Sequence, residues 1–547
     1  MRPNAVLALG FAVGLAALPA RAARNDHGGA RPFSQPLSKD EKIEQAVNRL
    51  TFGPRAGDAA LVRAVGLKKW LDMQLHPARI AENPALAEKL RALDTLTMPA
   101  EEMVRDYPPP QIIRQMVAGD IPFPADPERQ RVIRMLAERL DTKKGAPEPA
   151  EAPTLEGGTP QLRLAAFEAL PIEKQDEVMV ALPAGVRQGL LQVAPPELRR
   201  KIELAAGPQQ LVARDLAEAK LLRAIYSNRQ LEEVLADFWF NHFNVYLDKG
   251  ADHYLVTSYE RDAIRPRVLG RFRDLLEATA KSPAMLFYLD NWESARPSAA
   301  RARAGRGLNE NYGRELLELH TLGVDGGYTQ KDVTEVARCF TGWTIDRPQR
   351  GGGFVFNKKL HDDGEKVVLG VRIRAGGGIE DGEKVLDILA RHPSTARFIS
   401  LKLAQRFVAD DPPASLVDRM ARTFVRTDGD LRAVMKTMLG SREFWSRGAW
   451  RSKTKSPLEV VASAVRAVNG DVDTATALVN QVAQLGEPLY RKSEPTGYSN
   501  AREAWLSSAG LLARMNFAVR LASNRIPGVK VSGADALALG APAFQEH

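Results

Sequence analysis

The segment from Asn309 to Trp343, NENYGRELLELHTLGVDGGYTQKDVTEVARCFTGW, constrains the fold of this chain more than any other stretch. Apolar residues recur at helical spacing on both sides of a glycine-rich turn, which predicts two amphipathic helices joined by that turn. The residues that these helices can bury are Leu316, Leu317, Leu319, Val333, Val336, Ala337 and Phe340. Thr329 followed by Asp332 predicts a capping box at the start of the second helix.

Helical patterns fill most of the remaining sequence, so the predicted fold class is mainly α. We expect one large helical domain, with an N-terminal part at residues 38–142, a main core with the motif cluster at 209–525 and a weakly patterned tail at 526–547. The runs FVFNKKLHD and KVVLGVRI alternate apolar and polar residues and predict a small β-hairpin, the only strands expected.

Residues 143–208 read as a linker followed by an insertion of short-helix repeats. Three units of 12 residues, at 170–181, 182–193 and 194–205, carry Pro171, Pro183 and Pro195 in register. Proline in the first turn of each unit predicts short helices laid one after another. We expect this insertion to pack on the main domain, with recruitment of a partner as the alternative.

The first 22 residues have the pattern of a secretory signal peptide. Arg2 is followed by an apolar run to Leu18 and by a small-residue cleavage site that ends at Ala22. A polar leader at 23–37 follows. We therefore expect an exported protein, periplasmic or extracellular, with no transmembrane segment once the signal is removed.

Charge and cysteine content narrow the partners and cofactors. Lys and Arg number 76 against 67 Asp and Glu, and removal of two arginines in residues 1–22 lowers the formal charge from +9 to +7. This excess favours an anionic polymer or an envelope protein as partner, rather than nucleic acid, with a solvated basic surface as the alternative. Cys339 is the only cysteine, which excludes an intramolecular disulfide and sites built from several thiolates.

The first candidate chemistry is a pair of carboxyl groups. Glu315 and Glu318 share one helix face at i,i+3, and His320 joins them only if the helix ends near Leu319, where the helix dipole would favour the protonated imidazole. Such a pair hydrolyses bonds when burial raises the pKa of one acid and the other stays ionised, and Asp332 is a further candidate acid. The alternative is structural ion pairing with nearby arginines.

The second candidate chemistry is a metal site. Three histidines and an aspartate, His242, His320, His361 and Asp362, supply the nitrogen and oxygen ligands of a divalent metal that activates water. The alternative is a set of buried histidines held by hydrogen bonds, with HDDGEK at 361–366 as a polar turn. The motifs of nucleotide-binding proteins and common serine hydrolases are absent from the sequence.

Several of these segments resemble a secreted bacterial family known as domain of unknown function 1800. The matching pieces are NRLTFGPR, FWFNHFNV, the stretch from Asn309 to Ile345, HDDGEKVVLG, LGEPLYRKSEPTGYSN and AWLSSAGLLARMNF. The resemblance implies a mostly helical exported protein of unestablished activity, often encoded beside a secreted alkaline-phosphatase-like protein. The sequence departs from it in residues 143–208 and in Pro495–Tyr498, where a Gly-Trp pair is expected.

Two function classes follow from these observations. The first is a metal- or carboxylate-dependent hydrolase that acts on an envelope or extracellular polymer. The second is a non-catalytic binding or assembly protein of the cell envelope, in which the polar motif residues connect helices. Meeting of His242, His320 and His361 at one open point would favour the first class.

Overall fold

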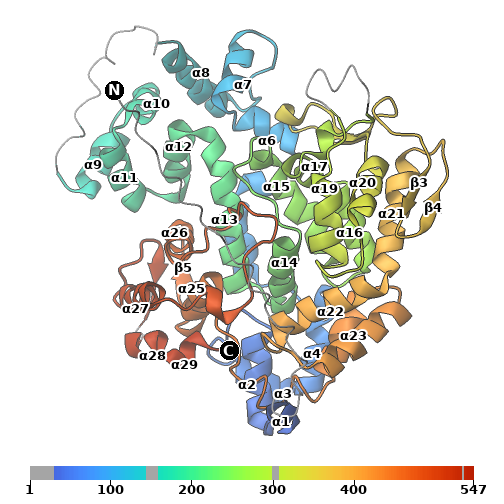
Figure 1. Ribbon diagram of the computed structural model, residues 1–547. Helices are drawn as coiled ribbons and strands as arrows, with labels where there is room; N and C mark the ends of the chain where they lie inside the picture. Colours follow the sequence, from blue (N-terminus) through green and yellow to red (C-terminus); the bar gives the residue numbers. More distant parts are fainter. Residues whose placement is uncertain (1–29, 143–154, 156–157, 298–306, 533–534) are drawn as a thin grey trace, which may run out of the picture.

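The computed structural model describes residues 30–142, 155, 158–297, 307–532 and 535–547, and over these residues the chain is mainly helical, as predicted (Figure 1). Figure 1 shows α13 (Pro208–Tyr226) and α14 (Gln230–His242) near the centre, with the C-terminal helices on one side. Because α13 is buried on nearly all sides, its charged residues need partners inside the core. Lys220, for example, pairs with Asp237 at 2.8 Å. The predicted signal peptide lies outside the described residues.

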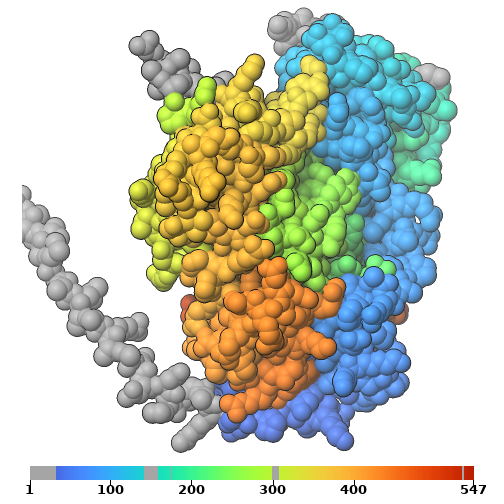
Figure 2. Space-filling model, turned by 90° about the vertical axis from the view of Figure 1, so that its right-hand side faces the viewer, coloured from blue at the N-terminus to red at the C-terminus, as the bar shows by residue number. Residues whose placement is uncertain are grey.

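The N-terminal helices wrap one end and one side of the core. They are α1 (Ala30–Ser34), α2 (Lys39–Arg49), α3 (Asp58–Val65), α4 (Leu67–Gln74), η1 (Pro77–Arg79), α5 (Pro84–Arg91), η2 (Asp94–Leu96), α6 (Ala100–Asp106), α7 (Pro110–Val117) and α8 (Pro127–Thr142). Ser38 and Glu41 form a capping box on α2. Arg432, far along the chain, donates to the carbonyl of Leu75 at 2.8 Å, and Figure 2 shows these two parts of the chain side by side.

The repeat insertion forms four short helices, α9 (Pro160–Glu168), α10 (Ile172–Ala181), α11 (Ala184–Val193) and α12 (Pro196–Ala206). Pro171, Pro183 and Pro195 stand immediately before α10, α11 and α12. The helices pack on α8 and α13 and bury Phe167 and Ile202 completely. These contacts are the packing arrangement that the repeat pattern predicted.

The middle of the chain carries the central stretch and two small sheets. Its elements are α15 (Asp252–Ser258), the π-helix η3 (Tyr259–Ile264), η4 (Arg265–Arg267), α16 (Phe272–Ala280), α17 (Pro283–Tyr288), η5 (Asn291–Glu293), α19 (Asn311–Glu315), the π-helix η6 (Leu316–Thr321), α20 (Gln330–Cys339), β1 (Trp343–Ile345), η7 (Pro348–Arg350), β2 (Phe354–Phe356), β3 (Lys366–Val368), β4 (Val371–Ile373), α21 (Ile379–Arg391), α22 (Pro393–Phe407), α23 (Ala414–Arg426) and α24 (Leu431–Leu439). The order places α20 between the central turn and both sheets.

The predicted hairpin exists, but its strands pair differently. KVVLGVRI alone forms the hairpin β3–β4, in which Val368 faces Val371, and β2 pairs with β1 instead. Leu369 and Gly370 make the two-residue turn with φ of 48° and 78°. That conformation suits a tight antiparallel hairpin, yet leucine at the first turn position gives no turn signal in the sequence.

The C-terminal part is ordered to its end over the described residues. It comprises α25 (Pro457–Ala467), β5 (Asp471–Val472), α26 (Thr476–Gln484), η8 (Arg502–Ala504), α27 (Ser508–Ala522), β6 (Val529–Lys530), α28 (Ala536–Gly540) and α29 (Pro542–Gln545). The predicted tail supplies β6, which pairs with β5, and it buries Val529 and Leu539. Elements this short leave little periodicity to read. In the described part of the chain, no helix has the length and apolarity needed to cross a membrane.

Candidate functional site

The central stretch folds as two helices around a turn, as predicted, and its capping box is present. The Thr329 side chain accepts from the Asp332 backbone, and the Asp332 carboxylate accepts from the Thr329 backbone at 2.9 Å. The two helices cross closely at Gly313, where an added Cβ would lie 3.1 Å from the carbonyl oxygen of Val333. Only glycine allows that approach without displacing α20.

The first helix changes to π geometry at Leu316–Thr321, the segment that holds Glu318 and His320. The Leu322 amide donates to the carbonyl of Leu317 at 2.9 Å, an i→i+5 bond, and the Thr321 hydroxyl donates to the carbonyl of Leu316. The helix therefore continues through Thr321, two residues beyond Leu319. Single π turns of this kind occur often at functional sites.

His320 is part of this π turn and lies inside the core, 2% exposed. Burial lowers its pKa to about 3. The ring is therefore neutral at ordinary pH, not the protonated imidazole that a helix end would favour. His242, at the end of α14, lies beside it, with ring centres 6.4 Å apart and Nε2 3.1 Å from the carbonyl oxygen of His320. Burial also lowers the pKa of His242 to about 3.

The end of α14 meets the loop at 488–498, which holds much of the C-terminal motif. Asn244 donates to the carbonyls of Lys492 and Glu494 at 2.9 and 3.0 Å, and the Asn241 side chain accepts from the Tyr498 amide. Gly497 has φ of +67°, and an added Cβ would lie 2.2 Å from the carbonyl oxygen of Asn241. Glycine is needed there on both counts.

Glu315 belongs to the same region through its neighbour Tyr288. The Tyr288 hydroxyl donates to the carbonyl of Ser493 at 2.7 Å. Burial raises the pKa of Tyr288, and the nearby charge of Glu315 adds to that shift. We call the meeting place of η6, the end of α14 and the 488–498 loop the motif junction. Its members are Asn241, His242, Asn244, Tyr288, Glu315, Glu318, His320, Tyr328 and residues 488–498.

Two carboxyl groups face the half-buried side of the motif junction. Burial raises the pKa of Glu315, and the neighbouring charge of Glu318 raises it further. Among the described residues, the Glu315 side chain has no hydrogen-bond or ion-pair partner. Glu318 accepts a bond from the Tyr328 hydroxyl at 3.3 Å. The junction thus places a carboxyl group whose pKa is raised by burial beside one that accepts a hydrogen bond.

The family comparison covers nearly the whole chain. The family described as Protein of unknown function (DUF1800) matches residues 45–545. The chain belongs to this family. No curated protein and no solved structure matches it.

The HDDGEK motif of this DUF1800 protein lies apart from the motif junction in its contacts. His361 is 1% exposed, and its ring joins the Thr341 carbonyl at 2.7 Å and the Asp381 carboxylate at 3.2 Å. Lys366 donates to the same carboxylate at 2.6 Å, and Arg338 binds Asp362 through Nε at 2.8 Å. These bonds connect α20, α21 and the β3–β4 hairpin.

The candidate metal ligands therefore divide between two places. His242 and His320 are neighbours, whereas His361 and Asp362 have other partners. Over the ranges that the structure describes, no three His, Cys, Asp or Glu side chains gather as metal ligands do. Asp332 also has structural bonds, since its second oxygen accepts from the Leu369 amide at 2.8 Å. The metal site stays a prediction of the sequence, and the geometry of the DUF1800 protein favours the carboxyl pair.

Sequence reasoning missed several polar residues of this region. Tyr288, Tyr328 and Lys402 carry no motif that singles them out in the sequence. Burial lowers the pKa of Lys402, whose ammonium lies 5.3 Å from the Phe398 ring centre. Asp252 is fully buried at the start of α15, and neither carboxyl oxygen has a hydrogen-bond partner among the described residues. The neighbouring residues in the sequence indicate neither the burial of Lys402 nor that of Asp252.

Proposed function

We propose that this DUF1800 protein is an exported hydrolase that cleaves an envelope or extracellular polymer with the carboxyl pair Glu315 and Glu318. The observation that carries the proposal is an unpartnered, half-buried Glu315 with a raised pKa, which immediately precedes the π turn that holds Glu318, where three family motifs meet. A carboxyl group whose pKa is raised by burial beside a second carboxyl group is a common basis of acid–base catalysis.

The reaction assigns one role to each carboxyl group. Glu318, as carboxylate, takes a proton from a water molecule while the water oxygen attacks the scissile carbon. Glu315, as carboxylic acid, gives its proton to the leaving oxygen or nitrogen as the bond to that carbon breaks. The products are the two polymer fragments, with the elements of water shared between them, and solvent exchange returns both acids to their starting states.

Partial exposure of both acids supports this assignment, because a polymer must reach them. Glu315 and Glu318 are half-buried, whereas His320 and His361 are closed off from solvent. Polymer substrates also suit a protein outside the cytoplasm. Fractionation of cells into cytoplasm, periplasm and medium tests this location, and a purely cytoplasmic protein would contradict it.

The proposal is tested by turnover of purified protein on isolated envelope material and on extracellular polysaccharide. New reducing ends, amines and carboxyl groups are measured for the wild type and for Glu315→Gln and Glu318→Gln. Each variant should retain its fold and lose roughly 100-fold or more in rate, because general acid and base steps each contribute about that much. Glu310→Gln, a carboxyl group bonded to Thr334 and Gln330, is the matched control and should keep most activity.

A second function, non-catalytic binding or assembly in the envelope, is favoured by the bonding of the other motif residues. Asn241, Asn244, Asp332 and His361 all connect one element to another. If every polymer is left intact by the wild-type protein while it sediments with envelope material, this function replaces the first.

A further inference from the structure

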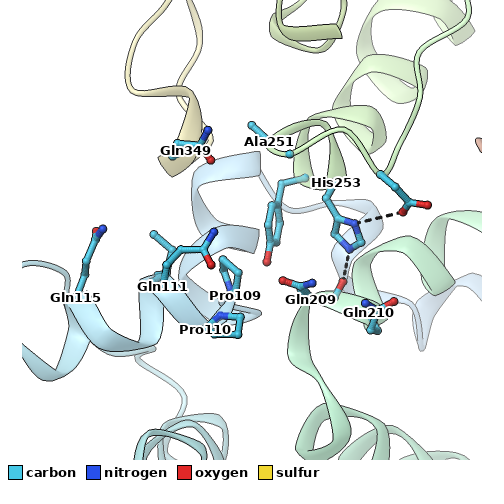
Figure 3. Close-up of a pocket in the computed structure, with 13 residues that line it drawn as sticks. Pro109, Pro110, Gln111, Gln115, Gln209, Gln210, Ala251, His253 and Gln349 are labelled. Atoms are coloured by element: carbon cyan, nitrogen blue, oxygen red, sulfur yellow. Dashed lines mark hydrogen bonds and ion pairs between the residues drawn. The ribbon is translucent and has the colours of Figure 1, made fainter. Parts of the chain in front are cut away.

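A cavity lies away from the carboxyl pair, where α7, α13 and α15 begin. It has a volume of about 520 Å³, within the range of small-molecule sites. Figure 3 shows Gln111 and Gln115 on one side, Gln209 and Gln210 on the other, and Gln349 reaching in from the η7 loop. Three separate segments of the chain therefore contribute side-chain amides to one space.

Most of these amides are free to bind a ligand. Gln115 accepts from Arg350 at 3.4 Å. The other four glutamines make no side-chain hydrogen bond to any residue in the described part of the chain. Each carboxamide offers two donors and an acceptor, so the cavity presents neutral polar groups that can both donate and accept hydrogen bonds.

His253 and Asp248 add two acceptors on one wall. The Nε2 of His253 lies 2.7 Å from the carbonyl oxygen of Gln209, so this nitrogen carries the proton and donates it. Burial lowers the pKa of His253, which keeps the ring neutral and leaves Nδ1 as an acceptor. Nδ1 lies 3.9 Å from the carboxylate of Asp248. Two acceptors that face each other at this distance are satisfied by a donor placed between them.

The charges of the lining exclude anionic ligands. Among the described residues that form the wall, none is lysine or arginine, although the chain holds 76 of them. Asp248 is the one carboxylate there, and Arg491 balances it from outside the wall at 2.8 Å. The cavity therefore suits a neutral ligand, in contrast to the anionic partner expected from the net charge.

We propose that this cavity binds a neutral oligosaccharide, with vicinal hydroxyl groups donating to Asp248 and His253 and the glutamine amides bonding the remaining hydroxyls. Sugar hydroxyls both donate and accept, which matches the amides. The buried proline and tyrosine rings of the wall, such as Pro109 and Tyr254, supply apolar contact for the ring carbons. Tyr254 cannot compete for the ligand, since its hydroxyl donates to the carbonyl of Tyr107.

The site is independent of the proposed hydrolysis, although the two are linked through the chain. The segment from Asn244 to His253 begins at the motif junction and ends in the cavity, and Arg491 of the 488–498 loop bonds to Asp248. Binding can nevertheless be measured without turnover.

Isothermal titration calorimetry of the full chain tests the proposal. The probes are maltotetraose, cellotetraose and chitotetraose, with tetragalacturonate as an anionic comparison and tetra-alanine as a peptide comparison. At least one neutral tetrasaccharide should bind. The double variant Gln111→Ala/Gln349→Ala should weaken that binding roughly tenfold or more, because two neutral hydrogen-bonding groups are lost.

Separate variants distinguish this site from the carboxyl pair. Asp248→Asn should also weaken binding, whereas Glu315→Gln should leave it unchanged. Gln161→Ala, an exposed glutamine of α9, is the matched control. The proposal is overturned if no neutral tetrasaccharide binds, if binding survives both cavity variants, or if tetragalacturonate or tetra-alanine binds in its place with the same dependence on Gln111 and Gln349.

Discussion

Replacement of Lys366 by methionine tests whether the HDDGEK motif is a structural connection. The ammonium of Lys366 is completely buried and donates to the Asp381 carboxylate at 2.6 Å, to the Gly364 carbonyl at 3.0 Å and to the Asp362 carbonyl. Methionine fills the space but leaves Asp381 with only the 3.2 Å bond from His361. Loss of one partner from a buried ion pair costs about 3–5 kcal/mol, and we expect Lys366→Met to lose that much free energy of unfolding.

Urea unfolding followed by circular dichroism measures the loss, with Lys384→Met as control. Lys384 is exposed on α21, and its replacement should change stability by less than about 0.5 kcal/mol. The deficit should depend on pH. Burial raises the pKa of Asp381, but bonds from His361 and Lys366 outweigh burial and lower it overall. Wild-type Asp381 therefore stabilises the fold above an unfolded pKa of about 3.9 and loses this effect as the pH falls through its folded pKa.

The difference between the Lys366→Met variant and the wild type should accordingly persist from pH 7 down to about pH 4 and shrink below that pH, as Asp381 becomes protonated. A loss below about 1 kcal/mol, or a deficit that does not change with pH, would refute the structural role.

Three further variants test other parts of the structure. The pKa of buried His320 is about 3, against about 6.5 in the unfolded chain, so the free energy of unfolding decreases as the pH is lowered from about 6.5 to about 3. The variant His320→Leu should reduce this slope by up to about 1.4 kcal/mol per pH unit. An unchanged slope would contradict the prediction. Gly497→Ala should lower the free energy of unfolding by about 2 kcal/mol or more, because of the contact with Asn241 and the positive φ. The control Gly486→Ala, with φ of +105° and no neighbour within 4 Å, should lower it by only about 1 kcal/mol. Equal shifts of the two melting temperatures would count against the contact. Burial raises the pKa of Asp252 well above its ordinary value, so the fold loses stability as the pH rises above about 3.9. The variant Asp252→Asn should therefore stabilise the fold at pH 7 by about 1 kcal/mol or more. A destabilised variant would show that the carboxyl group has a partner.

Local patterns predicted local structure well in this protein. Thr329 and Asp332 form a capping box because both partners lie within one turn of the chain. The shared face of Glu315 and Glu318 was readable for the same reason, since helical spacing alone brings them together. The proline before each repeat unit likewise predicted where α10, α11 and α12 begin.

Features that depend on distant residues were not readable. The π turn, with buried His320 in it, continues the helix through Thr321, and no local pattern indicated that geometry. His242 meets His320 across 78 residues, whereas His361 bonds to Asp381. All three histidines are alike in the sequence, and only packing separates them. The glutamine cavity combines four segments, none of which has a recognisable pattern.

The pH dependence of kcat/KM for polymer cleavage, compared between the wild type and Glu315→Gln, tests the central claim most directly. The raised pKa of Glu315 predicts that wild-type activity falls on the alkaline side as this acid ionises. In Glu315→Gln the rate should be lower than that of the wild type by roughly 100-fold or more, and it should not fall on the alkaline side. A variant with nearly the wild-type rate and the same alkaline fall would show that Glu315 is not the acid.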